Sequence, residues 1–118
     1  MSLDITLYYD KTTLPVDAWD DGREVVFERN ITHNLNRMAK IAGVYEAMWR
    51  PEEIGAHKAD DLSQALPKGF IFMIDNREEC EALNPENGWG NYEGLLNVIL
   101  DYLKACNKYP DAKVRAYL

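Results

Sequence analysis

The chain has 118 residues, of which 47% are hydrophobic and 28% charged, so it has the length of one domain and an ordinary globular composition. Its 20 acidic against 13 basic residues give a formal net charge of -7, which disfavours direct binding to nucleic-acid phosphates. The longest uninterrupted apolar run, 70–74, is far short of the roughly 20 residues of a membrane span. We therefore expect one acidic domain over residues 1–118, with neither a membrane nor a nucleic-acid partner.

The termini and the cysteines indicate a reducing compartment. The N-terminal residues 1–4 lack a basic region followed by an apolar run, so no export signal is expected. Cys80 and Cys106 are isolated from each other and from histidine at any zinc-ligand spacing. We expect both to be buried free thiols in a cytoplasmic protein.

Two strands are predicted at the start of the chain. Leu3, Ile5 and Leu7 alternate with polar residues, which is the period of a half-buried strand over 3–9. A polar stretch follows and ends in the turn signal Asp20-Asp21-Gly22. The run 24–29 is the second strand, and the short connection favours antiparallel pairing.

A helix is expected next. Asn30 and Thr32 are both suitable N-caps, because their side-chain oxygens can accept from the free N–H groups of a first helical turn. From Leu35 to Trp49, apolar residues recur at steps of three and four, past a possible bend at Gly43. Pro51 should end this helix.

The segment 60–76 is ambiguous. Its run Phe70–Ile74 has strand propensity, whereas Leu62, Leu66, Phe70 and Ile74 keep a helical step of four. A helix with Pro67 in its first turn fits that spacing. We favour the helix.

The C-terminal third contains an irregular loop, a long helix and a strand. The loop 84–90 is rich in turn formers, and Asn91 can cap the following helix. The apolar residues predicted to line the buried face of this helix are Tyr92, Leu95, Leu96, Ile99, Leu103 and Cys106. Residues 112–118 alternate again and should form a third strand beside the first two. The predicted fold class is α+β, with a small antiparallel sheet of N- and C-terminal strands covered on one face by three or four helices.

Several segments resemble a family of small proteins from bacteria and their phages, to which no activity is assigned. The matching residues lie at 30–35, 42–45, 84–94, 105–106 and 110–112, where the first and third blocks read NITHNL and NPENGWGNYEG. The resemblance begins near residue 24 and leaves the first strand uncovered. It implies a single cytoplasmic domain and a helix at 70–74, and it supplies no catalytic residue.

The most unusual local composition lies where the second strand meets the first helix. Asn30, Thr32, His33 and Asn34 concentrate hydrogen-bonding groups at a helix N-terminus, where free N–H donors favour an anionic or carbonyl ligand. That same field should favour the neutral form of His33. These residues either cap the helix and lock the corner, which is the more common role, or form a ligand or partner surface.

The second candidate segment is the loop before the last helix. Asn87 and its neighbouring glycines allow unusual backbone conformations, and Trp89 either plugs the core or stacks on a ligand. Because tryptophan is usually largely buried, we expect the plug. Tyr92 and Glu93 open the following helix, where the carboxylate complements the helix dipole.

Catalytic and metal-binding motifs are weak. A metal site would need His33 and His57 with carboxylates such as Glu46 or Asp60, and the histidines do not have a ligand-pair spacing. Neither cysteine has an adjacent histidine, and the usual glycine-rich phosphate motifs are missing from the sequence. We expect no metal, no cofactor and no catalytic residue.

Two functional hypotheses follow. The first is a non-enzymatic protein that binds another protein, in the class of phage-associated accessory factors. The alternative is a small ligand-binding protein or hydrolase that uses a polar pocket around His33 and Trp89. Because each candidate segment precedes a helix that must reach the same sheet, we expect His33 and Trp89 to lie together at one end of the molecule.

Overall fold

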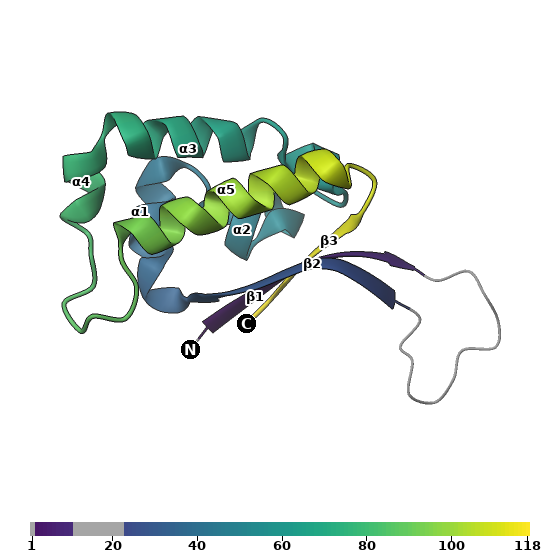
Figure 1. The fold of residues 1–118 in the computed structure, drawn as a ribbon, viewed down its shortest axis with the longest axis horizontal. Coiled ribbons are helices and arrows are strands. Elements are labelled where there is room, and N and C mark those ends of the chain that lie inside the picture. Colours follow the sequence, from purple (N-terminus) through teal and green to yellow (C-terminus); the bar gives the residue numbers. More distant parts are fainter. Residues whose placement is uncertain (1, 11–22) are drawn as a thin grey trace.

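A three-stranded antiparallel sheet brings the two ends of the chain together, as seen in this computed structural model, which describes residues 2–10 and 23–118 (Figure 1). The strands are β1 (Ser2–Asp10), β2 (Arg23–Thr32) and β3 (Lys113–Tyr117), in the order β2-β1-β3. Ile5 of β1 lies opposite Arg29 on one side and Ala116 on the other. The prediction that both chain ends contribute neighbouring strands is confirmed.

The sheet has one buried and one open face, as its alternation predicts. Leu3, Ile5 and Leu7 of the central strand are completely buried, whereas the residues between them are only half-buried. The pairing with β2 shifts register after Leu7, which is a bulge in the ladder. The predicted turn at 20–22 lies outside the described residues.

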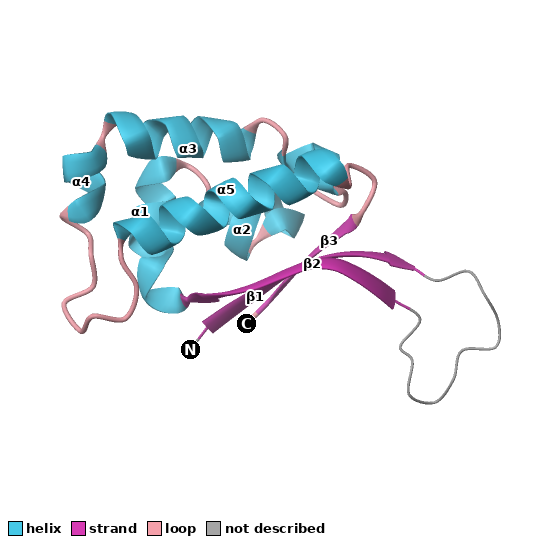
Figure 2. Ribbon diagram, viewed as in Figure 1, coloured by secondary structure: helices cyan, strands magenta, loops and turns pink. Residues whose placement is uncertain are grey.

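Helices cover the buried face of the sheet (Figure 2). Within the described part of the chain there are five α-helices and three short 3-10 helices. They are η1 (His33–Leu35), α1 (Asn36–Ala42), α2 (Tyr45–Trp49), η2 (Pro51–Ile54), η3 (Ala59–Leu62), α3 (Ala65–Asp75), α4 (Arg77–Glu81) and α5 (Tyr92–Lys108). The predicted α+β class is confirmed. The helical pieces outnumber the three or four expected, because predicted helices are divided and because η2 and α4 lie where no helix was predicted.

The predicted helix over 33–49 is interrupted, which corrects the expectation of one continuous stripe. Gly43 takes a left-handed conformation with φ of 79°, and its N–H donates to the Lys40 carbonyl at 3.1 Å. The apolar residues on both sides of the break are still buried, because the turn redirects α2 onto the same core. A stripe of apolar positions therefore specifies burial, and the glycine decides where the helix ends.

The ambiguous segment 60–76 is helical, so the preferred prediction is confirmed. Pro67 lies in the first turn of α3, where its missing N–H costs no hydrogen bond. Gly69 is buried, and a Cβ at this position would overlap the Val44 side chain. The helix can approach the α1–α2 turn so closely only because this residue has no side chain.

The last helix begins as predicted and buries a broader face than expected. The Asn91 side chain accepts from the Gly94 N–H at 2.7 Å. Ile99 is completely buried, but the predicted core residues Leu96 and Leu103 are only half-buried. Tyr102 takes their place at the centre of the core, where it stacks on Phe27 with ring centroids 5.5 Å apart.

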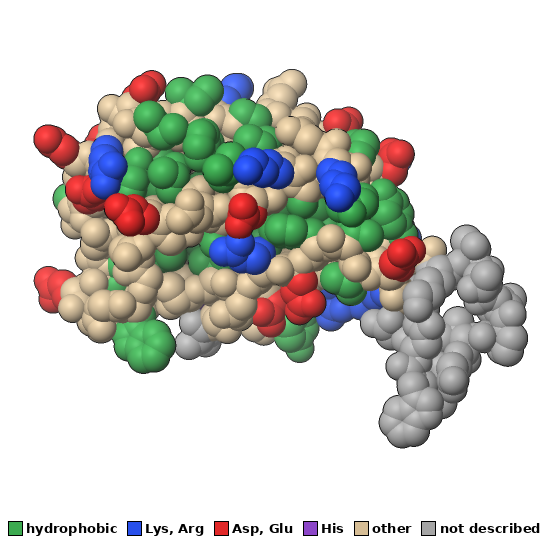
Figure 3. All heavy atoms as spheres, in the orientation of Figure 1, with side chains coloured by type: hydrophobic (Ala, Val, Ile, Leu, Met, Phe, Trp, Pro, Cys, Tyr) green, Lys and Arg blue, Asp and Glu red, His purple; other side chains and the backbone are tan. Residues whose placement is uncertain are grey.

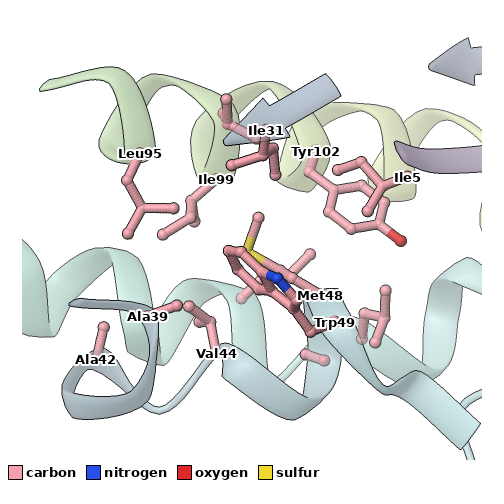
Figure 4. Packing of buried hydrophobic residues seen from close by; sticks show 14 of the residues in the cluster. Ile5, Ile31, Ala39, Ala42, Val44, Met48, Trp49, Leu95, Ile99 and Tyr102 are labelled. Carbon is pink, nitrogen blue, oxygen red and sulfur yellow. The ribbon is translucent and has the colours of Figure 1, made fainter. Parts of the chain in front are cut away.

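The core lies between the sheet, α2 and α5 (Figure 4). Met48 and Trp49 of α2 reach towards Ile99 and Tyr102 of α5. Cys80 and Cys106 are free and buried, as predicted. Among residues 2–10 and 23–118, no helix has both the length and the apolar composition to cross a bilayer.

Candidate functional site

The two polar segments chosen from the sequence meet at one end of the molecule. They enclose a cavity of about 510 Å³, whose lining residues are Ser2, Asn30, Thr32, His33, Asn34, Asn87 and Trp89. Figure 1 shows the loop between α4 and α5 descending beside the end of β2. The prediction that the Asn30 and Trp89 segments lie together is thus confirmed.

Gly90 is the residue that lets these segments meet. Its φ is 93°, and a Cβ placed on it would lie 2.6 Å from Cγ2 of Thr32 and 3.0 Å from Cγ of Leu35. Only glycine combines this backbone conformation with such close contact. Two side-chain acceptors hold the rest of the loop, since Asn87 Oδ1 accepts from the Trp89 N–H at 3.0 Å and Asn84 Oδ1 accepts from the Tyr92 N–H at 2.8 Å.

His33 is anchored from beneath by a residue that the sequence did not single out. The Trp49 indole N–H donates to His33 Nδ1 at 3.2 Å, and the Asn36 side chain lies 3.3 Å from Nε2. Because Nδ1 accepts this hydrogen bond, the neutral ring carries its own hydrogen on Nε2, and the Asn36 amide must turn its oxygen towards it. Both ring nitrogens are therefore engaged within the protein. The contact could not be inferred from the sequence, because the break at Gly43 sets the direction of Trp49.

Asn30 and Thr32 have different roles, although both were proposed as caps. Asn30 is a residue of β2, and its amide donates to Asp4 Oδ1 at 2.7 Å and to Ser2 Oγ at 3.1 Å across the strand pair. The Asn30 cap is therefore an incorrect prediction, because the strand extends to Thr32. Thr32 does cap η1, through a long 3.5 Å hydrogen bond from the Asn34 N–H.

Trp89 projects into solvent, which overturns the expectation that it plugs the core. Its exposed fraction is 69%, against 3% for Trp49. The positive φ of 76° at Gly88 and the Asn87 turn direct the loop tip away from the helices.

Tyr92 and Glu93 do not line this cavity, although the sequence grouped them with it. The Tyr92 hydroxyl is buried and donates to the Met73 carbonyl at 2.7 Å, while burial raises the pKa of this phenol. Glu93 is exposed and lies 3.4 Å from the Arg77 guanidinium. Both residues tie α5 to α3 and α4.

A second cavity adjoins the first. It also has a volume of about 510 Å³, and it shares His33, Asn34 and Asn87 with its neighbour. Its remaining lining residues are Asn36, Arg37, Ala82, Leu83, Asn84, Pro85 and Glu86. The two cavities therefore adjoin at the shared residues, and together they are called here the Trp89–His33 surface.

The lining of this surface is almost entirely neutral. Side-chain amides and hydroxyls dominate, and the charged residues are Arg37 and Glu86, both in the second cavity. Among the described residues, no three His, Cys, Asp or Glu side chains gather in a metal-binding arrangement. The chemistry at hand is uncharged hydrogen bonding beside one exposed aromatic ring.

Comparison with known proteins adds no relative. No protein-family model, curated protein or solved structure matches the chain.

Proposed function

We propose that this chain is a non-catalytic binding protein that holds an extended segment of another protein on the Trp89–His33 surface. Following the family resemblance, we place it among phage- or prophage-associated accessory factors of the bacterial cytoplasm. The observation that carries the proposal is the 69% exposure of Trp89, which lines the first of two adjoining cavities.

Exposing a tryptophan ring to water is unfavourable in free energy unless the ring contacts a binding partner. Trp is among the residues most enriched at the energetic centres of protein interfaces. Trp89 is also the most exposed of the large hydrophobic side chains among the described residues. Binding would remove its ring from water and thereby gain the hydrophobic free energy that folding does not gain for this side chain.

The neutral lining suits main-chain recognition. Asn34 and Asn87 belong to both cavities, and amide side chains can accept from a peptide N–H and donate to a peptide carbonyl. An extended peptide presents such groups at every residue, and it needs a site longer than one compact cavity. A site of two adjoining cavities supports that kind of occupant.

The hydrolase alternative is not favoured by the geometry of His33. A general base needs a free lone pair directed at the substrate, and Nδ1 already accepts from Trp49. Small-ligand binding remains the second candidate, because one cavity of about 510 Å³ falls within the usual range for such sites. The two candidates differ in whether the second cavity is needed.

Site-specific photo-crosslinking in the native host tests the proposal. A benzoylphenylalanine placed at position 89 should crosslink to one partner protein, whereas the same group at Val25, which is 51% exposed on β2, should not. With that partner purified, Trp89→Ala should weaken binding at least about tenfold, a loss of about 1.4 kcal/mol. Val25→Ala should leave the affinity unchanged.

Unfolding measurements exclude a trivial loss of structure. Since Trp89 is largely exposed, Trp89→Ala should change the free energy of unfolding by no more than about 0.5 kcal/mol. Equal crosslinking from positions 89 and 25, or unchanged affinity of the folded Trp89→Ala variant, would contradict the proposal. Native mass spectrometry that finds a bound small molecule and no protein would favour the second candidate.

A further inference from the structure

A second exposed surface lies on the helical layer, away from the cavities. Ile71 and Ile74 of α3 are 57% and 52% exposed, and Leu96, Leu100 and Leu103 of α5 are half-buried. Figure 3 shows apolar side chains gathered over α3 and α5 on the face it presents. None of these five residues lines either cavity of the Trp89–His33 surface.

The leucines of α5 lie on the side of that helix nearest α3. Positions 96, 100 and 103 follow steps of four and three, which place them along one stripe. Asp101, on the opposite flank, pairs with Arg29 of β2. The leucine stripe is therefore directed away from the sheet and towards α3, which packs against α5.

The two helices run antiparallel along this layer. The Tyr92 hydroxyl at the start of α5 donates to the Met73 carbonyl near the end of α3. Figure 1 shows the same arrangement, with α3 and α5 side by side and α4 leading from one to the other. At each end of the apolar patch, the start of one helix therefore lies beside the end of the other.

Exposed charged side chains of the two helices are also divided between the two ends of the patch. Asp75 and Glu93 lie at the end formed by the C-terminus of α3 and the N-terminus of α5. Lys68 and Lys104 lie towards the other end, and all four side chains are exposed. Arg77 of α4 lies at the acidic end, where it pairs with Glu81 at 2.6 Å and with Glu93 at 3.4 Å. The exposed Glu78 and Glu79 of the same helix keep this end acidic. Along α3 and α5, the patch consequently has an acidic end and a basic end.

We propose that a second copy of this chain covers the α3–α5 patch. A twofold axis perpendicular to the helices places the acidic end of one copy on the basic end of the other, so both charge sets meet opposite charges. The same rotation lays the leucine and isoleucine stripes against each other and removes them from water. A parallel arrangement would instead oppose like charges. This inference stands apart from the proposed function.

Sedimentation of the full chain tests the dimer. At a concentration of about 100 µM, the expected mass is twice the 13.6 kDa of one chain. Ile71→Glu should weaken association at least about a hundredfold and yield a monomer, because it buries an unpaired charge in the interface. Val25→Glu is the matched control on β2 and should leave the dimer intact. A monomeric parent chain, or a dimer that survives Ile71→Glu, would overturn the inference.

A charge exchange identifies the symmetry. Glu93→Lys and Lys104→Glu should each weaken self-association, because each creates a like-charge contact in an antiparallel pair. Mixing the two variants in equal amounts should restore a mixed dimer, because positions 93 and 104 of opposite chains then carry opposite charges at both contacts. Circular dichroism confirms that each variant is folded. In a parallel pair, positions 93 and 104 would each face their own counterpart, so neither single variant would add a like-charge contact to those of the parent chain. If each single variant associates as tightly as the parent chain, or if the mixture stays monomeric while the parent chain dimerises, the antiparallel arrangement is wrong.

Discussion

Replacing Gly90 by alanine should disrupt the contact that joins the two halves of the candidate site. The new Cβ would lie 2.6 Å from Cγ2 of Thr32, inside van der Waals contact, and the backbone φ of 93° disfavours any residue with a Cβ. The left-handed conformation costs about 1–2 kcal/mol. Overpacking adds about 1–3 kcal/mol. Alanine also restricts the unfolded chain more than glycine does, which offsets about 0.4–1 kcal/mol of this cost. The expected net loss is therefore about 3 kcal/mol.

Gly88→Ala is the matched control. Gly88 has a similar φ of 76°, but a Cβ there meets no atom within 4 Å. The expected loss of unfolding free energy for this variant is about 1 kcal/mol. It is the cost of the left-handed backbone alone, reduced by the same restriction of the unfolded chain. The difference between the two variants, about 2 kcal/mol, isolates the steric contact of Gly90 with Thr32 and Leu35.

Urea unfolding followed by far-ultraviolet circular dichroism measures both values. A domain of this size has about 5–15 kcal/mol of stability, so both variants should remain folded in the absence of urea. The midpoints should shift while the slope with urea stays constant. If Gly90→Ala and Gly88→Ala lose the same free energy within about 0.5 kcal/mol, the close approach of the loop to β2 is not what the structure indicates.

Four further outcomes concern the core. Gly69→Ala should destabilise the domain by about 1–3 kcal/mol although it raises helix propensity, and a simultaneous Val44→Ala should recover part of the loss by removing the overlap. Tyr102→Phe should stabilise it by about 1 kcal/mol, since the buried hydroxyl has no hydrogen-bond partner among the described residues; a loss would reveal a hidden acceptor. Burial raises the pKa of Cys80, and raises that of Cys106 to about 12, so both thiols should react with an aromatic disulfide at pH 8 only as fast as the protein unfolds. Because the unfolded Cys106 thiol ionises near pH 9, the contribution of this thiol to the free energy of unfolding should be constant below that pH and fall as the pH rises towards 12. The parent chain should therefore lose stability over that range more steeply than Cys106→Ala.

Much of the fold follows from local patterns. The alternation of Leu3, Ile5 and Leu7 predicts both the strand and its buried face, because side chains in a strand point to opposite sides in turn. Asn91 marks the start of α5, because its side chain satisfies an N–H that the first helical turn leaves free. These features depend on neighbouring residues, and the sequence displays them directly.

The broader face of α5 did not follow from its apolar pattern. Leu96 and Tyr102 are both hydrophobic, yet only Tyr102 is fully buried. A helix with apolar residues on more than one stripe can turn either stripe inward, and the contact between Tyr102 and Phe27 of β2 selects one. The leucine stripe left outside is the surface that we assign to a second copy.

The composition of the candidate site was predictable, and its working arrangement was not. The density of polar turn formers at Asn30–Asn34 and around Trp89 singled out the two segments that meet at the first cavity, because such residues collect where the chain reverses or caps a helix. Whether Trp89 is buried or exposed depends on how its loop closes against Thr32, and whether His33 is free depends on the orientation of Trp49. Residues distant in sequence decide both questions, through contacts that no local pattern encodes.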